Sequence, residues 1–308
     1  MRLLFLFLDG VGLGEDNPET NPFSQAEMPH LKALLSGKRL VASSAPYEDA
    51  RATLLPLDAC LGVSGLPQSA TGQAVLLTGQ NVPASLGYHY GPKPNPDVAA
   101  FLRNGNLFSQ LKSLGRRTAL INAYPPRYFD AINSGHRIYS AIPLAATSAG
   151  LSLKDYQSLI NGEALAADFT AQGWRDHLGL TEAPVISGWS AGQTLARLAG
   201  GTDFSFFEYW LSDYAGHRQD MRQSVALLEL IDEVLGGLIN SWEDQHGLVL
   251  ITSDHGNLED LTTRRHTLNL VPALIIGSPH LRSQFCREMK SLLDIAPAIV
   301  NFLTNYRE

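Results

Sequence analysis

Acidic residues follow three apolar runs of the sequence, each near the point where a buried strand would end. Asp9 follows the run LLFLFL, Asp213 comes shortly after FFEYWL, and Asp254 comes shortly after LVLIT. Ligands of open α/β sheets bind beyond the carboxyl ends of the strands, so neighbouring strands would bring these carboxylates together. Close carboxylates raise one another's pKa, and a metal cation relieves that repulsion. Each aspartate alone is equally well explained as a helix or turn cap, and only the three together favour a metal site.

Three of the nine histidines lie beside or just after these aspartates. His217 follows Asp213 by four residues, His255 is adjacent to Asp254, and His266 follows in the segment RRHT. A lone histidine is more often structural than ligating. Imidazole together with carboxylate suits Zn, Mn or Fe, whereas sites made only of oxygen suit Mg or Ca. Six such side chains give two metals three protein ligands each and leave positions open for a substrate.

The segment QSATGQA, residues 68–74, places hydroxyl groups at the start of a helical pattern. Alone, Ser69 is a typical helix cap. The same position also offers backbone N–H groups and the helix dipole to a phosphate. With metal ions nearby, the hydroxyl could lose its proton and act as a nucleophile. The segment is a weak signal that gains its meaning from the acids and histidines.

Short runs that are apolar on both faces predict the strands that position these residues, in a mainly parallel sheet. The runs are residues 3–8, 117–123, 204–211, 248–252 and 271–276. Helical spacing of apolar residues is found at 107–114, which Gly115 ends, at 221–242, and at 292–303, where Pro297 predicts a kink. The alternation predicts an α/β sandwich with a doubly wound sheet, in a single domain over residues 1–308.

The middle of the chain follows a different pattern. Residues 85–104 are rich in Gly, Pro, Asn and Tyr, which predicts a long loop. Residues 125–188 have weak periodicity and many small side chains. We expect them to form a small inserted cap over the sheet edge.

Composition narrows the class of protein. The formal net charge of −7 argues against a nucleic-acid or anionic-membrane partner. Two cysteines, Cys60 and Cys286, imply no disulfide framework, so a cytoplasmic location is the expectation. The N-terminal apolar run stops at Asp9 and is too short for a signal peptide, and no run approaches the roughly 18 residues needed to span a bilayer.

Together these segments resemble the alkaline phosphatase superfamily, most closely its branch of cofactor-independent phosphoglycerate mutases and phosphopentomutases. The resemblance covers residues 1–82 and 200–308. It is carried by LDGVG at Asp9, SATGQ at Ser69, DYAGH at Asp213, DHGN at Asp254, and HT followed by VP at His266. Within SATGQ the spacing from Gly72 selects Ser69, with Thr71 as the second choice. The family often has His where this chain has Gln73.

The resemblance implies a three-layer alkaline phosphatase-like sandwich with two divalent ions, Zn or Mn first and Mg as a further candidate. It implies that Ser69 is transiently phosphorylated. One ion would be held by Asp9, Ser69, Asp254 and His255, and the other by Asp213, His217 and His266. The substrate would be a small phosphorylated metabolite, and the sequence is silent on the oligomeric state.

Several functions remain open at this stage. The 144 positions between Ser69 and Asp213 leave little room for the large closing insertion of the phosphoglycerate mutases, which favours hydrolysis of a phosphate monoester over a phosphomutase. A relative that binds metal without catalysis is a third candidate. A dinucleotide-binding protein is disfavoured, because residues 9–14, DGVGLG, lack the G-x-G-x-x-G spacing and are followed by loop-forming residues.

Contacts to the substrate are the least specified part of the site. Arginine suits a phosphate through its forked guanidinium group, although most such residues are solvated surface charges. The candidates near the motifs or on the expected cap are His89, Arg127, Arg218 and Arg264, with Tyr124 and Arg265 beside them.

Overall fold

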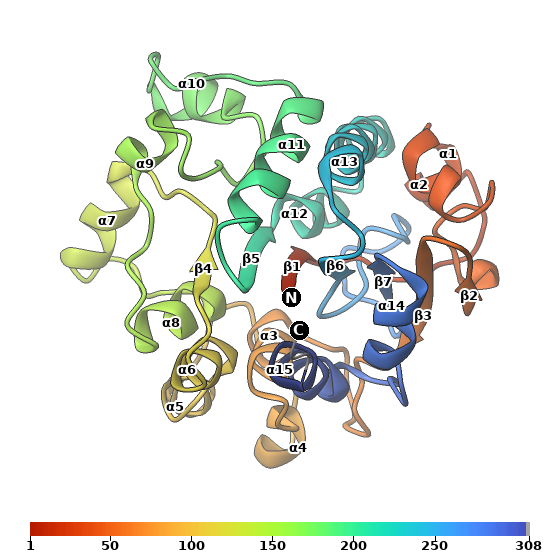
Figure 1. Cartoon of the computed structure of the whole chain (residues 1–308), viewed down its shortest axis with the longest axis horizontal. Coiled ribbons are helices and arrows are strands. Elements are labelled where there is room, and N and C mark those ends of the chain that lie inside the picture. The colour runs from red at the N-terminus through yellow and green to blue at the C-terminus, as the bar shows by residue number, and fades with distance from the viewer. Residues whose placement is uncertain (306–308) are drawn as a thin grey trace.

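In the computed structural model, which describes residues 1–305, seven strands form one sheet in the order β2-β3-β7-β6-β1-β5-β4 (Figure 1). The strands are β1 (Arg2–Leu8), β2 (Tyr47–Glu48), β3 (Ala52–Leu57), β4 (Thr118–Leu120), β5 (Phe204–Tyr209), β6 (Gly247–Thr252) and β7 (Val271–Ile276). The neighbouring strands β6, β1, β5 and β4 are parallel to one another. The pairs β6–β7, β7–β3 and β3–β2 are antiparallel. The predicted mainly parallel sheet is confirmed.

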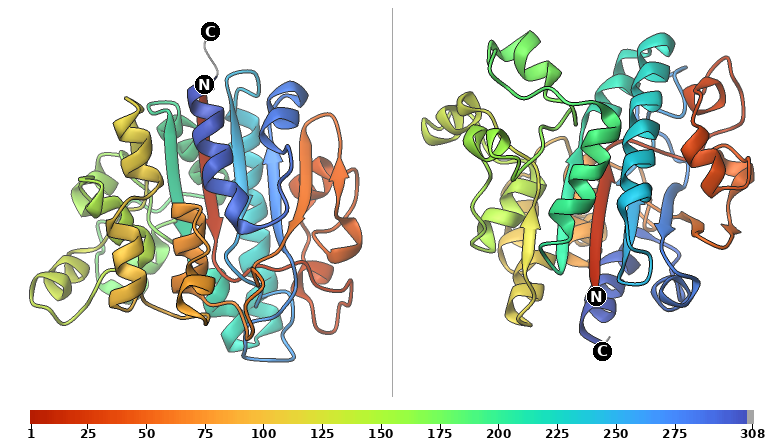
Figure 2. Two further views of the ribbon diagram at one scale, coloured as in Figure 1. Left: turned by 90° about the horizontal axis from the view of Figure 1, so that it is seen from below. Right: turned by 45° about the horizontal axis from the view of Figure 1, so that its top comes forward.

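Helices cover both faces of the sheet because side chains alternate between the faces along each strand. Leu3, Phe5 and Phe7 of β1 belong to one buried apolar cluster, and Leu4 and Leu6 belong to the other. Figure 2 shows one helical layer in each view, with α3 and α15 in front of the sheet in the first and α11 and α13 in the second. This arrangement is the three-layer sandwich that the sequence predicts.

The helices on the first face are α3 (Ser69–Thr78), α4 (Val82–Leu86), α5 (Pro96–Arg103), α6 (Leu107–Ser113), α8 (Ala141–Ser148), α14 (Pro279–Phe285) and α15 (Ile295–Asn305). Those on the second face are α1 (Pro22–Gln25), α2 (Pro29–Leu34), α11 (Gly188–Ala199), α12 (Leu211–Arg218) and α13 (Met221–Ser241). Beyond β4 lie α7 (Pro126–Asn133), α9 (Tyr156–Ile160) and α10 (Gln172–Leu178) (Figure 1). Two 3₁₀ turns, η1 (Ala42–Ser44) and η2 (Leu292–Asp294), complete the elements.

The edge of the sheet was incompletely predicted. The run ATLLPL forms β3 and pairs with β7, although Pro56 within it is unfavourable for a strand. The strand expected at 117–123 ends at Leu120, because Asn122 and Ala123 leave β5 and form single bridges to Leu165 and Lys154.

Two further predictions differ from the structure. Residues 96–103 of the expected loop form α5, which begins with Pro96 and is capped by the side chain of Asn95. The predicted C-terminal helix is present, but it does not begin at residue 292. A 3₁₀ turn precedes it and the α-helix begins at Ile295, which places the proline in the first turn, where its missing N–H breaks no helical hydrogen bond.

The segment expected to be a cap contributes to three separate apolar clusters, and its Leu165 and Phe169 belong to the one on the second face of the sheet. Ala141, Ile142 and Ala145 of α8 are buried in the main cluster on the first face of the sheet. Leu159 and Trp174 belong to a small cluster of their own beyond β4. A cap function for residues 125–188 stays a prediction. Within residues 1–305, no helix is both long and apolar enough to cross a membrane.

Candidate metal centre and nucleophile

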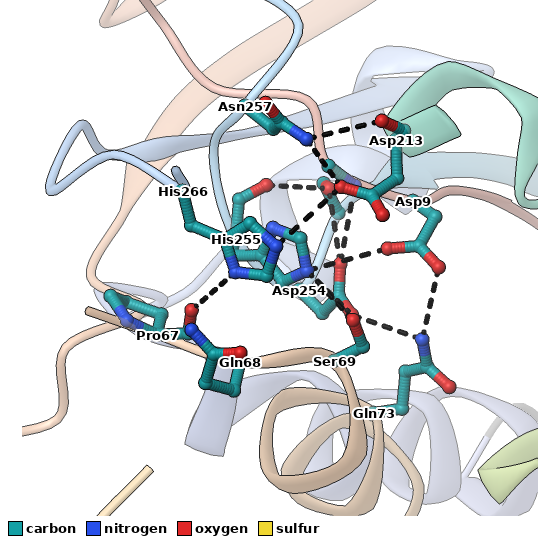
Figure 3. A network of polar contacts seen from close by, with 12 residues as sticks. Asp9, Pro67, Gln68, Ser69, Gln73, Asp213, Asp254, His255, Asn257 and His266 are labelled. Atoms are coloured by element: carbon teal, nitrogen blue, oxygen red, sulfur yellow. Dashed lines mark hydrogen bonds and ion pairs between the residues drawn. The ribbon is translucent and has the colours of Figure 1, made fainter. Parts of the chain in front are cut away.

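The three aspartates lie together at the carboxyl ends of the central strands (Figure 3). Asp9 directly follows β1, Asp254 lies two residues beyond β6, and Asp213 is in the first turn of α12 after β5. Because β1 pairs with both β5 and β6, the strand order itself brings these carboxylates to one place. Asp9 and Asp254 are almost fully buried.

Helix α3 brings the candidate nucleophile to these carboxylates. Ser69 is its first residue, and the Ser69 hydroxyl oxygen lies 3.1 Å from Nε2 of His255 (Figure 3). One turn later, Gln73 Nε2 donates to Asp9 at 3.2 Å and to Asp254 at 3.0 Å. The hydroxyl of Thr71 instead donates to backbone carbonyl groups, so the geometry favours Ser69 over Thr71. Gln73, whose role the sequence left open, links two of the acids.

The three histidines share one orientation. Nδ1 of His217 is 2.7 Å from the Arg264 carbonyl oxygen, Nδ1 of His266 is 2.7 Å from that of Pro67, and Nδ1 of His255 is 3.3 Å from that of Gly256. A carbonyl oxygen accepts only from a protonated nitrogen, so in a neutral ring each Nε2 keeps its lone pair. All three Nε2 atoms lie within 3.2 to 3.7 Å of an aspartate oxygen. Metal-binding histidines are commonly oriented in this way.

Two groups of side chains offer ligand atoms that lie within 4.8 Å of one another. The first is Asp213, His217 and His266, the set that the family resemblance implies for one ion. The second is Asp9, Asp213 and His255, in which Asp213 replaces the implied Asp254. Asp254 lies beside this second group, because its Oδ2 atom is 3.6 Å from His255 Nε2. The distribution of ligands between two ions stays a prediction.

The donor set fits divalent cations. Its imidazole nitrogens and carboxylate oxygens suit Zn or Mn better than Mg. Oδ1 of Asp9 is buried and accepts no hydrogen bond from the part of the chain that the structure describes. A buried carboxylate oxygen that accepts no hydrogen bond is costly, and coordination to a cation would remove that cost.

Electrostatics favour the same interpretation. Burial, with the charges of Asp254 and Asp213, raises the pKa of Asp9 well above its usual range. Burial and Asp213 raise the pKa of Asp254 to about 7. Burial lowers the pKa of His255, and burial together with His255 lowers the pKa of His266 to about 4. The protein thus holds repelling carboxylates beside neutral imidazoles, an arrangement that bound cations would stabilise.

Asp213 differs from the other two aspartates. Burial raises its pKa, but the hydrogen bond from His217, the charge of His255 and the Asn257 amide outweigh burial and bring the pKa to about 2. Asn257 Nδ2 donates to Asp213 Oδ1 at 2.6 Å. The hydrogen bond to Asp213 raises the pKa of His217 in turn. Asn257 belongs to the DHGN segment, but no local pattern singles it out.

Glu208 is a further acidic residue that the sequence interpretation missed. It is 7% exposed near the end of β5, pairs in register with Phe7, and lies two residues before the strand-to-helix junction. Burial, followed by the charge of Asp254, raises its pKa to about 7. A charged residue inside the apolar run FSFFEY was the available signal.

The candidate substrate contacts are scattered around this centre. Arg218 donates to the Tyr214 hydroxyl, and Arg264 Nε donates to Gln219, so both side chains already have partners. Arg127 is exposed on α7. His89 is half-buried, and burial lowers its pKa. The hydroxyl of Tyr124 and the exposed Arg265 complete the set, and a substrate role for any of these residues stays a prediction.

Comparison with known proteins finds similarity over about a third of the chain. The model of the Metalloenzyme superfamily matches residues 191–305, which include five of the seven candidate ligands but neither Asp9 nor Ser69. The chain is 29% identical over 106 residues to the 2,3-bisphosphoglycerate-independent phosphoglycerate mutase of Antithamnion sp., covering 32% of this chain and 21% of that protein. It is 30% identical over 107 residues to the mutase of Moorella thermoacetica, covering 33% and 20%. The chain thus spans about a fifth of the length of these relatives.

Solved structures extend the likeness of fold to the whole chain. The alkaline phosphatase of the Antarctic bacterium TAB5 superposes with a TM-score of 0.53 and 12% identity, covering 100% of this chain and 98% of that one. The phosphoglycerate mutase of Leishmania mexicana gives 0.53 and 12%, covering 100% and 96%. The whole chain therefore has the fold of these solved structures, and its residues 191–305 match the Metalloenzyme superfamily.

Proposed function

We propose that this protein is a two-metal phosphoryl-transfer enzyme that hydrolyses a phosphate monoester through a phosphoserine at Ser69. The observation that carries the proposal is the position of the Ser69 hydroxyl. It lies 3.1 Å from the Nε2 atom of His255, on a helix whose Gln73 binds both Asp9 and Asp254. An isolated helix cap would have no reason to face two buried carboxylates and an imidazole.

Seven side chains would hold the ions. They are Asp9, Ser69, Asp254 and His255 for one, and Asp213, His217 and His266 for the other, with Asp213 able to reach both groups. Bound divalent ions would supply positive charge that favours the ionised serine and stabilises the departing oxygen. The donor types favour Zn or Mn, with Mg as a weaker candidate.

The chain's own residues define the remaining chemistry. Ser69 presents its oxygen at the N-terminus of α3, where backbone N–H groups and the helix dipole favour a phosphoryl group. The serine oxygen forms a bond to phosphorus as the bond to the leaving alcohol breaks, and the alcohol takes a proton. Water then cleaves the phosphoserine, which releases phosphate and restores the hydroxyl.

A phosphomutase is the second candidate, because the relatives that match about a third of the chain are named phosphoglycerate mutases. In that reaction a hydroxyl of the retained alcohol attacks the phosphoserine in place of water. In either case the substrate is a small phosphorylated metabolite, and a cytoplasmic location remains our prediction.

Replacement of Ser69 by Ala tests the proposal. With p-nitrophenyl phosphate and added Mn²⁺ or Zn²⁺, we expect kcat/KM to fall by roughly three orders of magnitude. Mass spectrometry of the wild-type protein, quenched during turnover, is expected to find phosphate on Ser69. Ser64→Ala, which changes an exposed serine five residues upstream, is the matched control and is expected to retain activity.

The outcomes separate the candidate functions. Unchanged turnover by Ser69→Ala would exclude the nucleophile assignment. A wild-type protein that binds metal but turns over neither aryl phosphates nor phosphosugars would support the non-catalytic relative. Phosphoserine that is discharged only when an alcohol acceptor is present would identify a mutase.

A further inference from the structure

Glu259 lies in the loop after β6 and is 1% exposed, yet no part of the proposed chemistry uses it. Its Oε2 atom accepts from the backbone N–H groups of Gly12 and Asn257, each at 2.8 Å. Its Oε1 atom accepts from Asn269 Nδ2 at 3.0 Å and from the hydroxyl of Thr267. This buried carboxylate therefore has four donors and needs no cation of its own.

The donors come from three of the five chain segments that carry the candidate ligands. Gly12 is three residues after Asp9, Asn257 is two residues after His255, and Thr267 directly follows His266. The Gly12 segment is far from the other two in the sequence, and all three meet at the Glu259 carboxylate.

A fourth segment is connected through Asn257. The same residue that donates its backbone N–H to Glu259 also donates its side-chain amide to Asp213 Oδ1 at 2.6 Å and to the Asp213 carbonyl oxygen at 3.1 Å. The first-turn ligand of α12 is thereby linked to the same carboxylate. A shift of Glu259 would be transmitted to the ligands of both groups.

Glycines surround Glu259 because nothing larger fits. A Cβ atom at Gly12 would lie 2.3 Å from Glu259 Oε1, and one at Gly256 would also lie 2.3 Å from it. At Gly14 a Cβ would lie 2.7 Å from the backbone oxygen of Glu259. The DGVGLG segment, which superficially resembles a dinucleotide-binding motif, is thus explained at its second and third glycines by close approach to Glu259.

We infer that Glu259 is a positioning residue that sets the spacing of the ligand-bearing loops and thereby the metal affinity of the centre. The inference rests on the proposed function, since it presupposes that the centre binds divalent ions. Groups that orient metal ligands without touching the metal typically account for a 10- to 100-fold difference in affinity.

Three substitutions separate the role of the charge from that of the geometry. Glu259→Gln keeps one oxygen for the two backbone N–H groups, while its amide can donate to the Thr267 oxygen and Asn269 can reverse its own amide. Glu259→Asp keeps the charge but is one methylene shorter. It therefore cannot reach both the two backbone N–H groups and the side chains of Thr267 and Asn269. Glu259→Ala removes all four contacts.

A buried carboxylate elsewhere provides the matched control. Asp232 of α13 is 2% exposed and accepts from the backbone N–H groups of His30 at 3.0 Å and Leu31 at 2.7 Å. It joins α13 to α2 and contacts no candidate ligand. Asp232→Asn is expected to lower thermal stability and to leave metal affinity unchanged.

The experiment measures Co²⁺ binding to the metal-stripped full chain by calorimetry and by the visible spectrum of the bound ion. We expect Glu259→Ala and Glu259→Asp to bind Co²⁺ about 10- to 100-fold more weakly than the wild type, with an altered spectrum. Glu259→Gln is expected to stay within about threefold. Thermal melts of the metal-free proteins give the stability of each variant independently.

The results distinguish two failures. If the wild type binds no Co²⁺, the proposed function fails. If the wild type binds Co²⁺ and the Ala and Asp variants bind it equally well, only the role of Glu259 is refuted. The role of Glu259 would also be refuted if Asp232→Asn weakened Co²⁺ binding as much as the Glu259 variants do, at a similar loss of thermal stability. Metal affinity would then follow the general stability of the protein. Should the Ala variant not fold, the contrast between the Asp and Gln variants decides.

Discussion

Charge is distributed unevenly among the acidic residues at the ends of the central strands. Asp213 is stabilised as an anion by His217 and Asn257, whereas Asp9 and Asp254 are buried with raised pKa values. Glu208 belongs with Asp9 and Asp254, because burial and the charge of Asp254 raise its pKa as well. At the scale of single residues, the metal-free centre therefore carries carboxylates whose ionisation opposes folding.

Glu208→Gln is expected to stabilise the metal-free protein increasingly as the pH rises. Burial, with the charge of Asp254, raises the pKa of Glu208 from 4.5 to about 7. A folded-state pKa above the unfolded value means that stability is greatest below the unfolded pKa and is lost as the pH rises through 7. The glutamine variant avoids this loss. Urea unfolding at pH 5 and pH 8, in chelator, should show its advantage growing by about 2–3 kcal/mol.

The matched control for this measurement is Glu182→Gln, which removes an exposed carboxylate outside the site. Its effect on unfolding should be the same at both pH values. An advantage of Glu208→Gln that does not change with pH would contradict the raised pKa.

At the scale of elements, helix α3 is the part whose position matters most. Nine of its ten residues are buried, so it is held by packing on both sides and has little freedom to move. Gly72 allows its close approach to β6, because a Cβ atom there would lie 2.9 Å from both Cβ and the carbonyl oxygen of Asp254. The distance between Ser69 and the carboxylates therefore depends on a residue that bears no functional group.

Gly72→Ala is expected to lower kcat/KM for an aryl phosphate by about 100-fold, since a displacement near 1 Å in an active site has effects of that order. The added methyl group must push α3 away from Asp254, and Ser69 moves with the helix. Gly201→Ala, where the nearest atom to a new Cβ is 3.4 Å away, is the control and is expected to retain activity. Full activity of Gly72→Ala would show that α3 can shift without consequence.

The elements also show what the sequence could predict. The central strands were predicted well because their runs are apolar on both faces and end in Asp9, Asp254 or a helix containing Asp213. Strand β3 was missed because of Pro56, and α5 was missed because its start is rich in Pro and Asn. Residues whose role depends on contacts with distant parts of the chain cannot be identified from their local sequence. Gln73 and Glu259 belong to this class, since nothing near them in sequence shows what they touch.

At the scale of the whole molecule, the centre is assembled from five segments, at residues 9–12, 69–73, 213–217, 254–259 and 266–269. Three of these segments follow the parallel strands β1, β5 and β6. One forms the start of helix α3, and the last precedes the antiparallel strand β7. Loss of the native sheet order would separate the ligands. Metal binding should therefore be coupled to the stability of the entire domain, because the unfolded chain offers no preformed site.

Removal of divalent ions is accordingly expected to lower the melting temperature of the whole domain. An ion present at 100 times its dissociation constant adds about 2.7 kcal/mol, which corresponds to roughly 5 °C for a chain of this size. Calorimetry of the wild type with Mn²⁺ or Zn²⁺ and with excess chelator measures the difference. His217 belongs to one ligand group only, so His217→Ala should give a smaller metal-dependent rise than the wild type. Equal melting temperatures with metal and with chelator would show that the five segments hold their arrangement without any ion, and that the repulsion between the buried aspartates is relieved by protons instead.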